Sequence, residues 1–111
     1  MSVPFAVLRH ATTDWNVARR LQGLTDTPLN ARGHEQAHAL AERLVAEGRA
    51  VQAVFCSPLT RARQTANAIV NAFDGLPLQV DARLAEFNLG EWDGLTFEEL
   101  HHDKQLWKRM A

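Results

Sequence analysis

The 111-residue sequence has a single cysteine and little else that would mark a specialised class of protein. One cysteine cannot form an internal disulfide and suits a reducing compartment; because Cys56 lies in an apolar run, we expect a packed core thiol. A formal net charge of −1 gives no basic field for nucleic acid. No apolar stretch approaches the length of a membrane span, and no basic signal region precedes the first apolar run. We therefore expect a cytoplasmic protein with no nucleic-acid or membrane partner, forming a single domain over residues 1–111.

The hydrophobic pattern that remains predicts alternating strands and helices. Apolar runs at Val3–Leu8, Val51–Cys56 and Leu78–Val80 are typical of buried strands. Apolar residues at helical spacing predict helices around residues 37–45 and 59–73. The second helix is expected to begin at Ser57-Pro58, with serine as N-cap and proline as the first helical residue. This alternation predicts an α/β fold with a mostly parallel sheet and right-handed crossovers.

Two further segments lie outside this alternation. Residues 11–30 lack periodicity and contain turn-forming residues, so we expect a long loop, which in a compact domain tends to be functional. Thr96 and Glu99 have capping-box spacing and predict one more helix. Because that helix has no stop signal before Ala111, we expect the sequence to be the N-terminal part of a longer protein or a truncated product.

Polar residues of three kinds follow the predicted strands. Arg9 and His10 end the first, Arg61 lies in the first turn of the helix after the second, and Glu86 is the first acid after the third. Ligands bind beyond the carboxyl ends of strands in such sheets, and helix amides near Arg61 favour an anion. Arg63 would point away from this pocket. A nucleophile, cationic clamps and an acid suit phosphoryl transfer, although Arg9-His10 taken alone is more often a polar exit from a strand.

In four successive blocks the sequence resembles the histidine phosphatase superfamily, which has the phosphoglycerate mutase-like fold. The blocks read LRHATTDWN, LQGLTDTPLNARGHEQA, FCSPLTRARQTA and LAEFNLGEWDGLTFEEL. The resemblance implies a three-layer α/β/α fold, incomplete at its C-terminus, and chemistry that needs no metal or cofactor. It implies that His10 is phosphorylated and that Glu86 protonates the leaving oxygen. The phosphate- and substrate-binding residues that it implies are Arg9, Asn16, Gln22, Gly23 and Arg61.

The implied activity is hydrolysis of a small phosphorylated metabolite through a phosphohistidine at His10. The blocks are most similar to those of the family's small-molecule phosphatases, including enzymes that act on alpha-ribazole phosphate. Two departures keep alternatives open: Ala11 replaces the family's glycine, and nothing after Trp92 matches the block that carries its second catalytic histidine. A mutase-type transfer and a phosphate-binding fragment without turnover are the alternatives. An unpaired first strand also predicts a homo-oligomer.

A rival motif lies in the first predicted helix. His34, Glu35 and His38 form a literal HExxH, which on a helix places two imidazoles on one face for zinc. No third ligand is evident downstream, and a solvated helix start explains both histidines. A zinc peptidase is therefore the least favoured interpretation, and no metal is expected.

Overall fold

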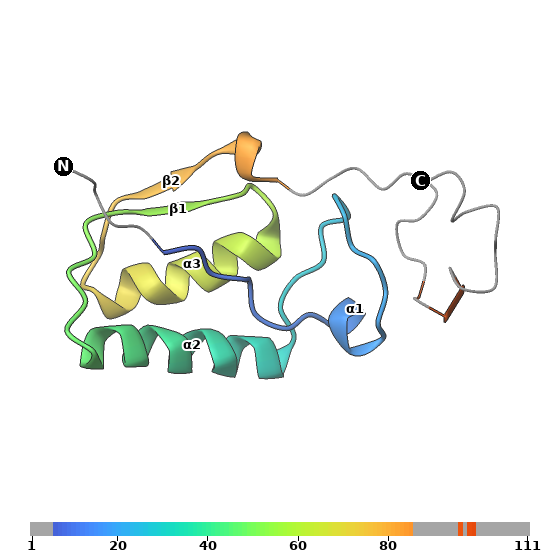
Figure 1. Cartoon of the computed structure of the whole chain (residues 1–111), viewed down its shortest axis with the longest axis horizontal. Coiled ribbons are helices and arrows are strands. Elements are labelled where there is room, and N and C mark those ends of the chain that lie inside the picture. Colours follow the sequence, from blue (N-terminus) through green and yellow to red (C-terminus); the bar gives the residue numbers. More distant parts are fainter. Residues whose placement is uncertain (1–5, 86–95, 97, 100–111) are drawn as a thin grey trace.

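The computed structural model describes residues 6–85, 96, 98 and 99 (Figure 1). Its elements are α1 (Asp14–Val17), α2 (Ala31–Ala46), β1 (Val54–Cys56), α3 (Thr60–Ala72), β2 (Leu78–Val80) and the 3-10 helix η1 (Ala82–Leu84). The predicted order of helix, strand, helix and strand from residue 31 to residue 80 is confirmed. The predicted acid Glu86 and the segment around Trp92 lie outside the described residues.

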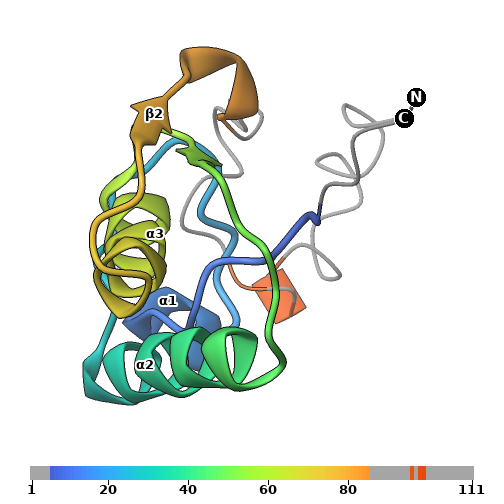
Figure 2. The same ribbon diagram turned by 90° about the vertical axis from the view of Figure 1, so that its left-hand side faces the viewer.

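β1 and β2 form a parallel pair, as the alternation of strands and helices predicts. Val54 lies opposite Leu78 and Cys56 opposite Val80. α3 packs against both strands, and α2 packs against α3 on the same side of the pair (Figure 2). The part of the chain that the structure describes therefore holds one helical side and the sheet, and the second helical layer of the predicted three-layer fold is not within it.

Small apolar side chains make the contact between the two long helices. Ala37 and Ala41 of α2 are 1% exposed and pack with Ala68 and Ile69 of α3. Leu29, just before α2, completes this buried cluster. Alanines at helical spacing let the two backbones approach closely, so α2 and α3 form a firm support for the loops at their N-terminal ends.

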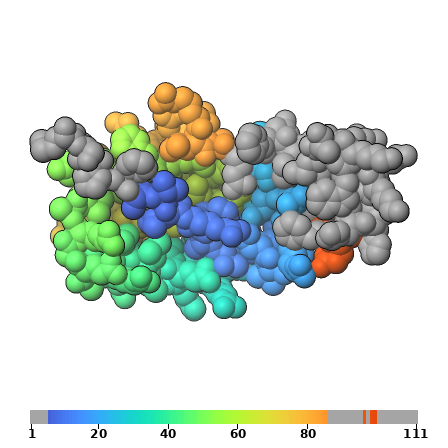
Figure 3. Space-filling model, viewed as in Figure 1, coloured from blue at the N-terminus to red at the C-terminus, as the bar shows by residue number. Residues whose placement is uncertain are grey.

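The predicted first strand, Val3–Leu8, is not formed in its described part. Ala6–Leu8 has no strand structure, and Val7 is 86% exposed. The first described segment lies at the surface of the molecule (Figure 3, dark blue). A strand needs a neighbour to satisfy its backbone groups, and no described strand pairs with this segment. The second predicted strand is also shorter than expected, since only Val54–Cys56 of residues 51–56 pairs with β2.

The predicted loop of residues 11–30 contains the short helix α1. Thr13 is its N-cap: the Asn16 amide donates to Thr13 Oγ1, and the Thr13 amide donates back to Asn16 Oδ1. This reciprocal pair is a capping box with asparagine in the place of the usual glutamate or glutamine, which is why the helix was not predicted. A bridge between Thr13 and Leu29 draws the two ends of the loop together.

The predicted start of α3 at Ser57-Pro58 is wrong. The helix begins at Thr60, and its N-cap residue, Leu59, makes no side-chain capping bond. Instead Asp26 caps the helix from the loop: its carboxylate accepts from the Thr60 amide at 2.6 Å and from the Thr60 hydroxyl at 2.8 Å. A carboxylate at a helix N-terminus satisfies free amides and complements the dipole, so a residue 34 positions away performs the local capping role.

The predicted capping box at Thr96 and Glu99 is confirmed. The Thr96 amide donates to Glu99 Oε2 at 3.3 Å, and the Glu99 amide donates to Thr96 Oγ1 at 3.1 Å. The remainder of the predicted helix lies outside the described residues. Of the helices that the structure describes, none has the length and apolar character needed to cross a membrane.

Candidate functional site

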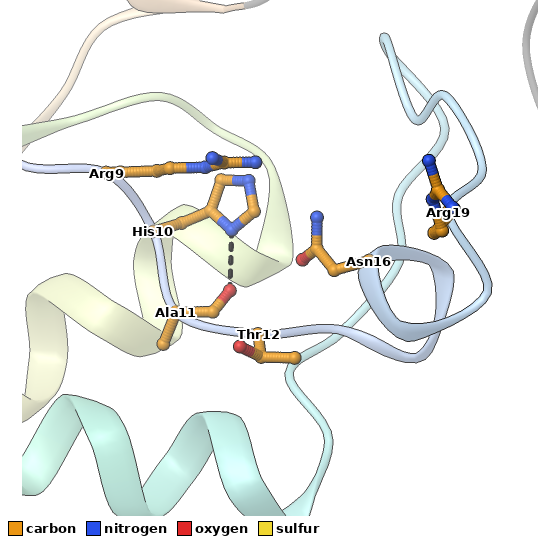
Figure 4. Close-up of a pocket in the computed structure, with 6 residues that line it drawn as sticks. All are labelled: Arg9, His10, Ala11, Thr12, Asn16 and Arg19. Carbon is orange, nitrogen blue, oxygen red and sulfur yellow. Dashed lines mark hydrogen bonds between the residues drawn. The ribbon is translucent and has the colours of Figure 1, made fainter. Parts of the chain in front are cut away.

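A pocket of about 390 Å³ lies where the N-terminal segment meets α1. Six residues line it: Arg9, His10, Ala11, Thr12, Asn16 and Arg19 (Figure 4). The structure thus brings together three of the predicted site residues, Arg9, His10 and Asn16. Its lining charges are the two arginines, so the pocket suits an anionic ligand.

One hydrogen bond indicates which nitrogen of the neutral His10 ring carries the proton. Nδ1 lies 2.6 Å from the backbone oxygen of Ala11, the dashed line in Figure 4. A carbonyl oxygen can only accept, so Nδ1 carries the proton in this bond and Nε2 keeps its lone pair when the ring is neutral. Nε2 is therefore the nitrogen prepared for nucleophilic attack.

Asn16 is oriented so that its amide NH₂ is the end available to a ligand. The Thr13 backbone amide donates to Asn16 Oδ1 at 2.9 Å, which assigns the oxygen end of the side chain. In Figure 4 the Asn16 side chain lies between the His10 ring and Arg19, with its nitrogen pointing up. The residue thus offers a neutral hydrogen-bond donor beside the imidazole.

Gln22 and Gly23 lie behind this lining. The buried Gln22 Oε1 accepts from the Thr13 hydroxyl at 2.6 Å and also from the Thr27 hydroxyl. The Gly23 carbonyl accepts from Arg61. Neither residue is among the six that line the pocket, and their contacts hold the loop that carries α1; their role in binding substrate stays a prediction.

Arg61 is fully buried beneath the same loop. Nη1 donates to the Thr25 carbonyl and Nη2 to the Gly23 carbonyl, each at 2.7 Å. The guanidinium is not among the groups that line the pocket, so its role as a phosphate ligand stays a prediction. Its position at the start of α3 is as expected from the sequence.

Thr65 connects α3 to the candidate nucleophile. The Ala11 amide donates to Thr65 Oγ1 at 3.1 Å, and the Thr65 hydroxyl donates to the Arg61 carbonyl at 2.9 Å. The residue next to His10 is therefore tied to the helix turn that carries Arg61. The amide and the carbonyl of Ala11, the residue after His10, therefore both make hydrogen bonds.

Two titratable groups on either side of the start of α3 in the sequence have pKa values displaced from their ordinary range. The hydrogen bonds from Thr60, backbone amide first, lower the pKa of Asp26, and the charges of Arg61 and Arg63 act in the same direction. Burial raises the pKa of the Cys56 thiol, which keeps it in its unreactive form. Cys56 is a buried free thiol, as the sequence predicts.

Sequence reasoning missed three polar residues that shape the site. Thr13, 0% exposed, and Thr65 join the loop, the nucleophile segment and α3, and Arg19 lines the pocket. The capping spacing of Thr13 and Asn16 is a usable sequence signal for the first of these. Thr65 and Arg19 have none, because their roles depend on which segments the fold brings together.

The HExxH histidines lie away from the pocket lining. His34 and His38 are exposed on α2. Within the described residues no three or more histidine, cysteine, aspartate or glutamate side chains gather closely enough to hold a metal ion.

Two packed helices, a parallel strand pair and a histidine beside cationic and amide donors define a class: an α/β protein with a pocket suited to an anion at the end of its first segment. Comparison with known families makes this specific. Residues 5–111 match the family model described as histidine phosphatase superfamily (branch 1), and the chain belongs to this superfamily.

Individual relatives agree with the family assignment. A probable phosphoglycerate mutase GpmB of Yersinia enterocolitica is 37% identical over 103 residues, which are 93% of this chain and 46% of the relative. The chain thus spans about half the length of the curated relatives it matches.

Solved structures give the same result. A mycobacterial glucosyl-3-phosphoglycerate phosphatase, solved with VO3, is 41% identical at a TM-score of 0.77; the match covers 85% of this chain and 44% of that one. A phosphoserine phosphatase from Entamoeba histolytica, in complex with 3-phosphoglyceric acid, is 33% identical at a TM-score of 0.75, covering 89% and 47%. A putative alpha-ribazole-5'-P phosphatase from Escherichia coli is 34% identical at a TM-score of 0.77, covering 91% and 50%.

Proposed function

We propose that this chain carries the nucleophile half of a phosphatase that hydrolyses a small phosphorylated metabolite through a phosphohistidine at His10. The observation that carries the proposal is the contact between His10 Nδ1 and the Ala11 carbonyl, 2.6 Å long, because it leaves Nε2 as the nucleophile. The solved relatives that are named phosphatases support hydrolysis as the reaction. The proposal includes a single domain over residues 1–111 and no metal or other cofactor.

The reaction has two steps: a P–N bond to His10 forms in the first and breaks in the second. His10 Nε2 attacks phosphorus, the bond from phosphorus to the ester oxygen breaks, and that oxygen takes a proton from an acid, the role proposed for Glu86. Water then attacks the phosphohistidine, the P–N bond breaks, and inorganic phosphate leaves with the ring restored. Glu86 must be protonated in the first step and can accept the proton of water in the second.

The cationic and amide groups of the pocket stabilise the transferring group. Arg9 and Asn16 line the pocket with His10 (Figure 4), which supports assigning the Arg9 guanidinium and the Asn16 NH₂ to the non-bridging oxygens of the phosphoryl group. We assign Arg61, Gln22 and Gly23 to the same phosphate and substrate pocket. Arg61 also contributes its buried positive charge at the N-terminal turn of α3, where helix amides favour an anion.

A mutase-type transfer is the second candidate, favoured by the relatives named probable phosphoglycerate mutase. In that reaction an acceptor hydroxyl replaces water in the second step, and the phosphohistidine is the same. The proposed partner in either case is a small phosphorylated metabolite, and the proposed compartment is the cytoplasm, in keeping with a single, buried, free cysteine.

The direct test is release of inorganic phosphate from p-nitrophenyl phosphate in the presence of EDTA. His10→Ala should lower the rate by at least about 1,000-fold, as loss of a nucleophile does in other covalent enzymes. His38→Ala, which changes an exposed histidine on α2, is the matched control and should leave the rate unchanged.

The remaining outcomes separate the alternatives. Turnover that survives in His10→Ala contradicts the proposal. Loss of activity with EDTA together with loss in His38→Ala favours the zinc interpretation. Binding of phosphate without turnover by the unaltered chain favours the phosphate-binding fragment.

A further inference from the structure

The peptide group between Ala11 and Thr12 makes a hydrogen bond at each of its ends. Its carbonyl, from Ala11, lies 2.6 Å from His10 Nδ1 (Figure 4). Its amide, from Thr12, donates to Gln36 Oε1 at 3.1 Å. Because a peptide group is one planar unit, the direction of the carbonyl that receives the imidazole proton is tied to the bond that Gln36 makes. A continuous series of hydrogen bonds therefore runs from α2 to the candidate nucleophile.

Gln36 is oriented to act as an acceptor. A backbone amide can only donate, so the oxygen end of the Gln36 side chain faces Thr12. The same oxygen accepts from the Thr12 hydroxyl at 2.7 Å. Gln36 occupies a variable position of the HExxH sequence on α2, and the residue that it holds, Thr12, lines the pocket. This part of the motif therefore has a connection to the site that zinc chemistry does not explain.

Thr65 of α3 holds the preceding peptide group. Its hydroxyl oxygen accepts from the Ala11 amide at 3.1 Å and donates to the Arg61 carbonyl at 2.9 Å. Thr65 is 6% exposed, so this anchor is shielded from water. With one peptide group held by α3 and the next by α2, the Ala11 carbonyl cannot turn away from His10 without breaking one of these bonds.

We propose that Gln36 is a positioning residue for the nucleophile and acts through the Ala11–Thr12 peptide group to keep the proton of the His10 ring on Nδ1. When Nε2 forms its bond to phosphorus, the ring becomes positively charged and retains the Nδ1 proton. The bond to the Ala11 carbonyl is then charge-assisted, and the amide bond to Gln36 polarises that carbonyl further. This effect on phosphoryl transfer rests on the proposed function, whereas the effect on the neutral ring can be measured without turnover.

Nitrogen NMR of the full chain tests the effect on the ring. With ¹⁵N-labelled histidine, the ring shifts in alkaline solution report which nitrogen of neutral His10 carries the proton, and His10→Ala identifies its signals among the five histidines. The Nδ1–H form should predominate in the unaltered chain. Gln36→Ala should raise the fraction of the Nε2–H form by about threefold, the shift expected from the loss of one ordinary hydrogen bond. Gln36 is exposed on α2, so this variant retains the core.

Gln64→Ala is the matched control. Gln64 lies on α3, and its Oε1 accepts from the Leu29 backbone amide at 2.8 Å, outside the pocket lining. Removing it deletes the same kind of bond and should leave the His10 ring unchanged. Gln36→Glu is the rescue, because a carboxylate oxygen can still accept from the Thr12 amide. This variant should show the same ring state as the unaltered chain.

The rate of phosphoryl transfer from p-nitrophenyl phosphate to His10 is the second measurement. It should fall by about three- to tenfold in Gln36→Ala and stay the same in Gln64→Ala. The inference is overturned by an unaltered chain that carries the proton on Nε2, by no change of the ring in Gln36→Ala, or by an equal change in Gln64→Ala. An unchanged rate of transfer in Gln36→Ala also overturns it. A ring that responds as expected in a chain that transfers no phosphoryl group supports the positioning role and contradicts the proposed hydrolysis alone.

Discussion

At the residue scale, Ala11 sets the state of His10 with its backbone rather than its side chain. Its carbonyl accepts the Nδ1 proton, and its amide is held by Thr65 Oγ1. The side chain itself takes no part in either bond, which explains how alanine can replace the family's glycine. The difference between sequence and family at this position therefore leaves both backbone contacts in place.

Asp26 gives a residue-scale prediction. Its carboxylate caps α3 through the Thr60 amide and hydroxyl. Asp26→Ala should lower the free energy of unfolding by about 1 kcal/mol, the usual cost of losing an N-cap. Denaturant unfolding measures this, with Glu42→Ala, an exposed change within α2, as the control that should have little effect.

The same interaction predicts a pH dependence. The hydrogen bonds from Thr60 lower the pKa of Asp26 in the folded chain. Its stabilisation is therefore present above about pH 3.9, the ordinary aspartate value, and is lost as the pH falls through the lowered pKa. The difference in unfolding free energy between the unaltered chain and Asp26→Ala should shrink in acid; a difference that is constant down to about pH 2 contradicts this cap.

The residues of the site could be predicted only where they lie close together in the sequence. Arg9, His10 and Asn16 are brought to one pocket as the sequence blocks indicate. Asp26, by contrast, caps a helix from 34 positions away. Sequence spacing carries no information on such a long-range contact.

At the scale of elements, α2 supports the nucleophile segment through a close backbone contact. A Cβ built on Gly33 would lie 2.0 Å from the Thr12 oxygen. That oxygen accepts from the Asn30 amide at 3.1 Å, and Gln36 Oε1 accepts from the Thr12 amide at 3.1 Å. The first turns of α2 thus fix the residue two positions after His10, and only glycine fits the contact.

Gly33→Ala tests this support. The methyl group would overlap backbone atoms that cannot move without breaking the Asn30 bond, so we expect a loss of about 3 kcal/mol in unfolding free energy, the upper end for overpacking. Affinity for phosphate should fall with it, because the pocket lining shifts. Denaturant unfolding measures the loss of stability, and calorimetry on the folded protein measures the affinity for phosphate.

Gly48→Ala is the matched control. Gly48 has a φ of 68° but no atom within 4 Å of its added Cβ, so only backbone strain of about 1 kcal/mol is expected. Equal effects of the two substitutions would contradict the close contact at Gly33.

Elements with strong periodicity were predicted well and their ends were not. The alanine-rich pattern of α2 and α3 and the apolar runs of β1 and β2 gave the right order and a parallel pair. The missed features are α1, whose capping box has asparagine at its third helical position, and the start of α3. Both depend on hydrogen bonds that differ from the usual capping patterns in sequence: an asparagine completes the capping box of α1, and Asp26 caps α3 from a distant loop.

At the scale of the whole molecule, apolar side chains remain open to solvent around the strands. Val7 is 86%, Phe55 57% and Val80 47% exposed. Together with a first segment that lacks a strand partner in the described part of the chain, this keeps the homo-oligomer a prediction. An apolar surface with unpaired backbone groups favours pairing with a second copy.

Sedimentation velocity over a range of concentrations tests the association. We expect a dimer that forms with increasing concentration and is weakened by Val7→Lys combined with Phe55→Lys. Val45→Lys, at an exposed apolar position on α2, is the control and should leave the dimer intact. A well-folded monomer at every concentration would contradict this expectation.

The central claim, that His10 Nε2 takes up a phosphoryl group, is tested most directly by trapping that group. The full chain is mixed with a phosphoryl donor, quenched in base, and the modified residue is located by mass spectrometry and assigned to one nitrogen by ³¹P and ¹⁵N NMR. The account predicts an acid-labile phosphoryl group on Nε2 of His10 that is absent in His10→Ala. A phosphoryl group on Nδ1, on another residue, or on no residue at all would contradict it.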